Sequence, residues 1–186
     1  MSRIGKAPIV LPANVTVDVS ESNYVTVTGP KGKLEQQITG NISVTKVEQD
    51  GKTAILLVAN DNLADTNAKH GLYRALLNNM VVGVSQGFTK SITVNGVGYK
   101  VAVQGNKLVL NIGFSHPVNF DIPAGLTVTC PTATEILVAG INKEQVGQFA
   151  ADIKAIKPVE PYHGYGIHYT NENVIRKEIK KGAKKK

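Results

Sequence analysis

Residues that could stack on nucleobases and bind phosphate lie together near the C-terminal end of the 186-residue chain. The segment 158–169 reads PVEPYHGYGIHY, so three tyrosines and two histidines stand among prolines and glycines. Planar rings stack on bases and sugars, and glycines let a backbone approach another surface closely. Because basic residues follow directly, the composition indicates an RNA-binding surface, although at least one tyrosine is expected to pack on its own domain.

The positive charge is concentrated in the same part of the chain. Residues 154–186 contain nine basic and three acidic side chains (9 − 3 = +6), whereas residues 1–153 contain 12 and 11 (+1), which together give the net charge of +7. A nearly neutral body with a basic end is typical of a protein that binds a polyanion. A merely solubilising tail is the alternative, and a membrane surface is less favoured, because Val174 and Ile179 alone form no inserting face.

These observations predict an RNA-contacting surface and its members. The residues expected to face RNA are Lys157, His163, Tyr165, His168, Arg176, Lys177, Lys180 and Lys181. Lys154 is not included, because it could equally lie on the solvated face of a helix. Attachment to phosphates would supply affinity, while the shape of folded RNA and the bent Pro/Gly segment would supply specificity.

Several fragments resemble parts of enzyme sites but are incomplete. The run GPKGK at 29–33 is similar to the end of a phosphate-binding P-loop, yet the complete motif needs glycine where Val27 stands and Ser or Thr where Leu34 stands. The run GVG at 96–98 lacks the third glycine of a dinucleotide-binding loop, since Val101 occupies that position. We expect a hairpin loop and a sheet bend in these two places.

The histidines and the cysteine form no catalytic or metal-binding pattern. The four histidines have neither the HExxH spacing nor a neighbouring pair of carboxylates. Cys130, the single cysteine, lies in an expected strand on the side of Val128 and is predicted to be a small buried hydrophobe. We therefore predict a protein that is not an enzyme, with no cofactor, no metal and no small-molecule substrate.

Composition and patterning predict which elements position these residues. Apolar residues make up 42% of the chain and charged residues 19%, and 18 glycines with few aromatics favour a β-rich body. Apolar runs are far shorter than the ~20 residues of a membrane-spanning helix, and no secretory signal is recognisable. We expect no membrane partner and a reducing intracellular compartment.

An internal repeat indicates a duplicated fold. Residues 9–29 align without a gap with residues 120–140 at a constant offset (123 − 12 = 111), and six of the 21 positions are identical. Both segments have Pro-Ala followed by alternating apolar residues, which predicts a turn and strands with one buried face.

One helix is expected in each half. Asn60-Asp61 offers an N-cap before apolar residues that continue to Val84, and Asn142 precedes an apolar stripe that Pro158 ends. The predicted fold class is α+β, with two similar domains from an internal duplication, each an antiparallel sheet packed against a helix. The expected parts are residues 1–82, an RNA-binding domain at 83–170 and a basic C-terminal extension at 171–186.

On its motifs the chain resembles the bacterial and organellar form of the large-subunit ribosomal protein L6 family. The resemblance covers essentially the whole length and is carried by SRIGK (2–6), GPKG (29–32), HGLYRALLNNMVVGVSQGFTK (70–90), NGVGYK (95–100), GNKLVLNIGFSHPV (105–118), EPYHGYGIHY (160–169) and ENVIRKE (172–178). It implies two similar α+β domains, with the C-terminal one on large-subunit ribosomal RNA near the translation-factor (GTPase-associated) site. It also implies neighbouring ribosomal proteins as partners and a place on cytoplasmic ribosomes, or in an organellar matrix or stroma.

The chain departs from the family at three positions of one segment. The family signature usually reads PEPYKGKG, whereas this chain has Val159 first and has His163 and Tyr165 in place of the two lysines. Lysine–phosphate contacts are therefore not implied there; hydrogen bonding by His163 and stacking by Tyr165 are the substitutes left open.

Two alternative classes of function stay open. One is a protein–protein adaptor with exposed sheet edges, and the other is a nucleotide-dependent enzyme built on the glycine loops.

Overall fold

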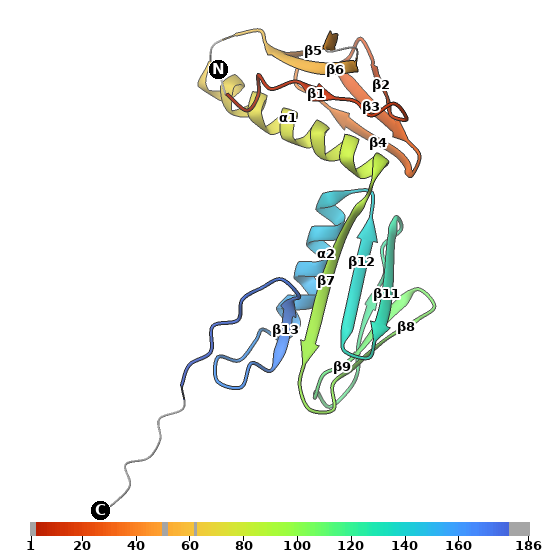
Figure 1. Ribbon diagram of the computed structural model, residues 1–186, viewed down its shortest axis with the longest axis vertical. Helices are drawn as coiled ribbons and strands as arrows, with labels where there is room; N and C mark the ends of the chain where they lie inside the picture. Colours follow the sequence, from red (N-terminus) through yellow and green to blue (C-terminus); the bar gives the residue numbers. More distant parts are fainter. Residues whose placement is uncertain (1–2, 50–51, 62, 179–186) are drawn as a thin grey trace, which may run out of the picture. The chain divides into compact units, whose positions relative to one another are not determined.

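The computed structural model describes residues 3–49, 52–61 and 63–178, which form two compact units (Figure 1). The first unit comprises the described residues up to Phe88 together with Ile141–Lys143, and the second comprises Thr89–Gly140 and the residues from Glu144 onward. The first unit reaches beyond the expected boundary at 82, because its helix continues to Ser85. The assignment of functional parts at 1–82, 83–170 and 171–186 stays a prediction.

The first unit has two three-stranded sheets and a long helix. Its elements are β1 (Ile9–Val10), β2 (Thr16–Val19), β3 (Tyr24–Gly29), β4 (Gly32–Gln37), β5 (Ile42–Gln49), β6 (Lys52–Ala59) and α1 (Ala64–Ser85). The sheets have the orders β2-β3-β4 and β1-β6-β5. Alternation places Val17, Val25 and Val27 in the core, where they join apolar residues of both sheets and of α1 in one buried cluster.

The second unit repeats this plan and extends it. Its elements are β7 (Phe88–Asn95), β8 (Lys100–Gln104), β9 (Lys107–Asn111), β10 (Val118–Asp121), β11 (Leu126–Thr132), β12 (Glu135–Gly140), α2 (Lys143–Ile156) and β13 (Gly166–Tyr169). The sheets have the orders β10-β9-β8 and β11-β12-β7-β13. The predicted stripe on α2 is confirmed, since Val146, Phe149, Ala150 and Ile153 are buried.

The strand orders confirm the predicted duplication. The sheet β2-β3-β4 corresponds to β8-β9-β10, and β1-β6-β5 corresponds to β7-β12-β11, each copy being followed by its helix. Within the described residues, β13 has no counterpart in the first unit. The predicted fold class, two similar α+β domains with antiparallel sheets, therefore agrees with the structure.

The alignment from which we inferred the duplication is wrong. It equates 9–29 with 120–140, and so it matches hairpin β2–β3 with hairpin β11–β12, although these belong to different sheets of the plan. The false match arises because both hairpins alternate with period two: Val17 pairs with Val27 as Val128 pairs with Val138. A Pro-Ala turn before each hairpin completes the similarity.

The helix starts also test the sequence reasoning. α1 begins after Leu63, whose backbone is extended and which makes no side-chain capping bond, so the predicted N-cap at Asn60-Asp61 is wrong. Asp61 instead accepts a hydrogen bond from the Leu63 N–H with its Oδ1 atom at 3.2 Å. α2 begins directly after Asn142 and ends at Ile156, before Pro158, as expected.

Candidate RNA-binding surface

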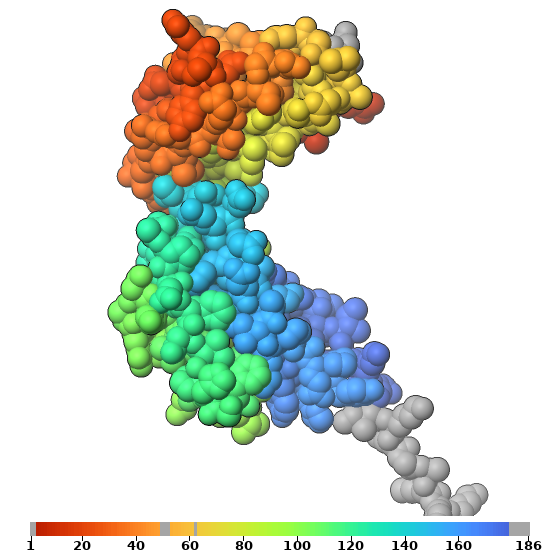
Figure 2. Space-filling view, turned by 180° about the vertical axis from the view of Figure 1, so that it is seen from behind, coloured from red at the N-terminus to blue at the C-terminus, as the bar shows by residue number. Residues whose placement is uncertain are grey.

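The C-terminal segment folds back onto the second unit and extends one of its sheets. After α2, residues 157–165 form a loop, and β13 then pairs antiparallel with β7, with Ile167 opposite Val94. The loop closes on itself, since the Glu160 N–H donates to the Tyr165 carbonyl and the Ile167 N–H to the Lys157 carbonyl, both at 2.8 Å. The loop lies at the surface beside α2 (blue, Figure 2), whereas Gly166 and Ile167 of β13 are buried.

Gly166 is the residue that permits this return. Its φ of 137° lies in the region that favours glycine. A Cβ atom there would lie 2.6 Å from the Pro158 carbonyl oxygen and 2.7 Å from the Val159 Cα atom. The backbone of β13 can approach the start of the loop only because residue 166 has no side chain.

Two predicted site residues form a stacked pair at the loop. The rings of His163 and Tyr165 are nearly parallel, with an interplanar angle of 10° and a centroid distance of 5.5 Å. The His163 side chain is 54% exposed and Tyr165 is 42% exposed. His163 Nδ1 lies 3.2 Å from the Oε1 atom of Glu160, which orients the imidazole.

Arg176 and Lys177 are brought to the same loop. The Lys177 N–H donates to the Pro161 carbonyl at 2.8 Å, which holds the following chain against the loop. The Arg176 guanidinium lies over Gly164, where a Cβ atom would come within 2.8 Å of Nε. Both basic residues are exposed, so four predicted site residues meet on one exposed surface, which we call the C-terminal loop surface: His163, Tyr165, Arg176 and Lys177.

Lys157 has a different environment at the base of the loop. Its Nζ atom donates to the Ile112 carbonyl at 2.7 Å and lies 4.7 Å and 5.1 Å from the ring centroids of Tyr99 and Phe114. The ammonium group thus binds the loop to the β9–β10 connection through a hydrogen bond and cation–π contacts. The prediction that Lys157 faces RNA stays a prediction, and the structure shows an intramolecular role.

His168 lies on β13 opposite Thr93 and is half-buried. Its Nδ1 atom is buried without a hydrogen-bond partner among the described residues. The two remaining predicted residues, Lys180 and Lys181, lie outside the part of the chain that the structure describes.

The sequence analysis did not predict the role of the Glu172 carboxylate, which anchors the residues after β13. Lys154 Nζ donates to both carboxylate oxygens of Glu172 at 2.7 Å, and the Tyr169 N–H donates to Oε2 at 3.2 Å. These hydrogen bonds lower the pKa of Glu172 below its ordinary value, and the bond from Lys154 has the largest effect. Lys90 and Lys154 both lie over the Tyr169 ring, at 5.0 Å and 4.8 Å. No local sequence pattern predicts the role of Lys90, because Tyr169, which its side chain contacts, is far away in the sequence.

The P-loop-like run has a structural explanation. The Lys31 N–H donates to the Val84 carbonyl at 3.0 Å, and Lys31 Nζ donates to the Gln86 carbonyl. These two carbonyls belong to the C-terminal end of α1, where unpaired carbonyl groups and the negative end of the helix dipole favour a cation. The GPKG turn is therefore a tertiary cap for α1.

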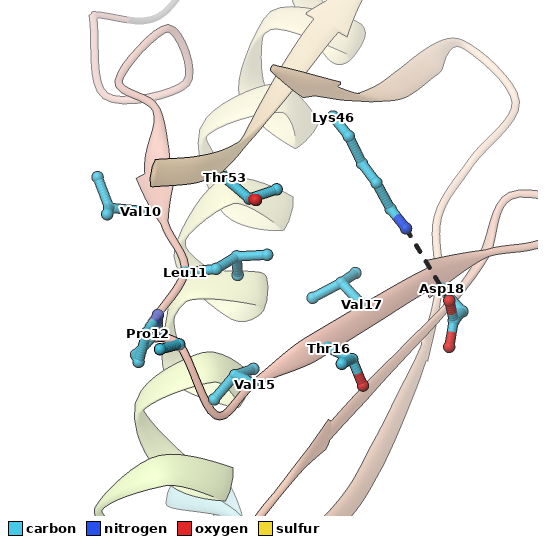
Figure 3. Close-up of a pocket in the computed structure, with 10 residues that line it drawn as sticks. Val10, Leu11, Pro12, Val15, Thr16, Val17, Asp18, Lys46 and Thr53 are labelled. Atoms are coloured by element: carbon cyan, nitrogen blue, oxygen red, sulfur yellow. Dashed lines mark ion pairs between the residues drawn. The ribbon is translucent and has the colours of Figure 1, made fainter. Parts of the chain in front are cut away.

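A pocket in the first unit lies between β1, β2 and the β5–β6 hairpin (Figure 3). It has a volume of about 670 Å³ and is lined largely by apolar side chains such as Val10, Leu11 and Val17. Lys46 Nζ and Asp18 Oδ1 form an ion pair of 3.9 Å there. The lining brings together no nucleophile and base.

Metal clusters and membrane-spanning helices are two other candidate features. Among the described residues, no group of three or more His, Cys, Asp or Glu side chains is arranged to hold a metal ion. None of the described helices has the length and apolar character needed to cross a membrane. Cys130, predicted to be buried, is half-buried, and partial burial raises the pKa of its thiol.

Comparison with known proteins identifies the family. The family model described as "Ribosomal protein L6" matches residues 11–87 and 95–170, one match in each copy of the fold. The chain is 48% identical over 184 residues to "Large ribosomal subunit protein uL6" of Dictyoglomus thermophilum and to that of Clostridioides difficile, covering 99% of this chain and 100% of each relative. The corresponding protein of Thioalkalivibrio sulfidiphilus is 48% identical over 181 residues, 97% of this chain and 99% of the relative.

These matches confirm two predictions made from the motifs. The family predicted by the resemblance is the family found, and because that family is not enzymatic, the prediction that the chain is not an enzyme is confirmed. With matches in both copies of the duplicated fold and relatives aligned over nearly the whole length, the chain belongs to the ribosomal protein L6 family.

Proposed function

We propose that this protein is a structural constituent of the large ribosomal subunit that binds large-subunit ribosomal RNA near the translation-factor site. The observation that carries the proposal is the C-terminal loop surface, where two exposed rings and two basic residues meet. Family membership supports it, since the relatives bear the name of a large-subunit protein. The binding partners would be the RNA and neighbouring large-subunit proteins.

In the proposed mechanism, basic side chains supply the affinity and the shape of the loop supplies the specificity. Arg176 and Lys177, with the basic residues that follow, would neutralise phosphates and release counterions. Such contacts position a protein but read no sequence, so the shape of the loop would select the RNA fold. The hydrogen bonds that close the loop and attach Lys177 to it hold that shape before binding.

We also propose that RNA binding resides in residues 83–170 with the extension 171–186, and that residues 1–82 form a separate domain. The charge distribution supports this, because the net charge is concentrated after residue 153. Ribosomes in the cytoplasm are the proposed location; an organellar ribosome would place the same surface in a matrix or stroma. Because α1 continues to Ser85, the fragments for the test are 1–88 and 89–186, which keep that helix whole; they should give at least one cooperative thermal transition, whereas two unfolded fragments would contradict separate domains.

The decisive experiment is co-sedimentation of the full-length protein with ribosomal particles at low and high salt. The protein should pellet with the large subunit and detach only at high salt, because phosphate contacts are salt-dependent. An adaptor working outside the ribosome would stay in the supernatant at both salt concentrations. A calorimetric titration with nucleotide should give no heat of binding.

A further inference from the structure

The stacked pair at the loop has free aromatic surface. His163 and Tyr165 each use one ring face on the other, and both side chains are still substantially exposed, at 54% and 42%. Parallel rings at this spacing accept a further planar ring, since stacking needs only an exposed π-face. A base held within a duplex has both faces covered, so only an unpaired base could extend this stack.

The charges around the pair disfavour a phosphate at the same position. The Glu160 carboxylate lies 3.2 Å from His163 Nδ1, which places a negative charge beside the rings. A second anion close to this carboxylate would be repelled. A neutral base meets no such penalty.

A positively charged side chain suited to binding a phosphate lies beside the stacked pair. The Arg176 guanidinium rests over Gly164, which stands between the two ring-bearing residues in the chain. Gly164 has a φ of 76°, and any side chain there would occupy the place of the guanidinium. The loop therefore offers an aromatic surface and, beside it, a planar cation that suits a phosphate.

Resting on the proposed RNA-binding function, we propose that the His163–Tyr165 pair is the binding site of a single unpaired nucleobase of the RNA, and that Arg176 contacts the phosphate next to it. The site then recognises a nucleotide that is bulged or flipped from its helix. This differs from the lysine–phosphate contact that the family signature implies at these two positions.

The first arm of the test separates base stacking from phosphate contact. The probe is a transcript of the large-subunit ribosomal RNA from the source organism, titrated with the full-length protein at several salt concentrations. Tyr165→Leu should weaken binding about 5- to 150-fold without changing the slope of log affinity against log salt. Tyr165→Phe should bind like the wild type, and Arg176→Gln should make the slope shallower by about 0.7–0.9.

The second arm is a spectroscopic reporter. The chain contains no tryptophan, so Tyr165→Trp introduces a single indole into the stack. Its fluorescence should be quenched when the transcript is added, because the indole contacts a base. Tyr24→Trp, at a 36% exposed tyrosine of the first unit, is the matched control and should not be quenched. Melting temperatures of all variants establish that they are folded.

The outcomes distinguish this inference from the function on which it rests. A wild-type protein that does not bind the transcript contradicts both. A wild type that binds while Tyr165→Leu binds equally well, or while Tyr165→Trp is not quenched, overturns only the base site. A Tyr165→Leu variant with a shallower salt slope would mean that the loop contacts phosphate instead of a base.

Discussion

The two units have the same sheets and helix, but different terminal segments complete them. In the first unit, the N-terminal residues lie along α1: Gly5 packs against the ring of the buried His70, and Arg74 Nε donates to the Ala7 carbonyl at 3.2 Å. In the second unit, the C-terminal segment adds β13 to the outer edge of β7, the counterpart of β1. The C-terminal loop surface belongs to this added segment and not to the repeated strands.

A second comparison concerns how each helix end is held. In the first unit, Lys31 comes from the β3–β4 turn and donates to the Gln86 carbonyl after α1. In the second unit, Lys157 comes from the residues after α2 and donates to the Ile112 carbonyl in the β9–β10 connection. In both copies a lysine joins the end of the helix to the connection between the second and third strands of the three-stranded sheet. The lysine belongs to that connection in the first unit and to the end of the helix in the second. A duplicated scaffold can therefore keep a contact while exchanging the residue that makes it.

The largest effect is expected from removing residues 176–186, which leaves both scaffolds intact. The deletion takes away seven basic side chains and one acidic side chain (7 − 1 = +6). With roughly half of the seven in phosphate contacts, the slope of log affinity against log salt becomes shallower by roughly 2–3 units, about a hundred- to a thousandfold in affinity at ~0.1 M salt. Specificity over an unrelated duplex should change much less, because the deletion removes the bond from Lys177 but keeps the two bonds that close the loop, Glu160 N–H to the Tyr165 carbonyl and Ile167 N–H to the Lys157 carbonyl. An unchanged slope would show that these residues stay in solvent.

Gly166→Ala should destabilise β13, the strand that distinguishes the second unit. Backbone strain and the contact with the Pro158 carbonyl should cost about 3 kcal/mol of unfolding free energy and weaken RNA binding. Urea denaturation measures the loss. Gly147→Ala is the control: it lies in α2 with nothing within 4 Å of the added Cβ, so it should stabilise by about 0.5–1 kcal/mol. Wild-type stability of Gly166→Ala would refute the proposed constraint.

Lys157→Met and Lys31→Met form a matched pair that tests the exchanged lysine. Lys157 is half-buried with a hydrogen bond and two aromatic contacts, so its loss should cost about 2 kcal/mol. Lys31 is exposed, and its loss should cost about 0.5–1 kcal/mol. Thermal unfolding measures both. A shallower salt slope of RNA binding for Lys157→Met, with unchanged stability, would instead place Lys157 on RNA.

The smallest effect concerns Glu172, which anchors the residues after β13. Because its folded-state pKa is below the ordinary 4.5, its bonds stabilise the fold above about pH 4.5, and this contribution is lost as the pH falls through the folded-state pKa. Glu172→Gln should lower stability at pH 7 by about 0.5 kcal/mol, because the ion pair is partly exposed, and the difference should disappear as the pH falls below the folded-state pKa of Glu172. Faster hydrogen exchange of the Tyr169 amide should accompany it.

The first unit supplies the comparison for this pH effect. Hydrogen bonds from Lys33 and Tyr24 also lower the pKa of Glu35, but these residues lie on the β3–β4 hairpin. Glu35→Gln should therefore leave the amide exchange of the C-terminal segment unchanged. An equal acceleration at Tyr169 in both variants would show that Glu172 has no specific anchoring role.

The family, the fold class and the α2 stripe could be predicted from the sequence, because each is encoded within short windows. Motifs such as EPYHGYGIHY are contiguous, and the buried face of α2 follows from a period of 3.6 residues. The equivalence of the hairpins could not be predicted in this way. Alternation with period two is common to every half-buried hairpin, so only the strand order shows that β11–β12 corresponds to β5–β6.

The sequence by itself therefore determined that an aromatic and basic segment lies at the C-terminus, and it predicted an RNA-facing role for the four residues of the C-terminal loop surface, which stays a prediction. Only the tertiary structure decided that His163 stacks on Tyr165, that Arg176 lies over Gly164 and that Lys157 is held by Tyr99 and Phe114. The physical reason is separation along the chain. Composition and periodicity specify what a segment can do, whereas contacts between residues tens of positions apart depend on how β13 and its loop pack against the sheets.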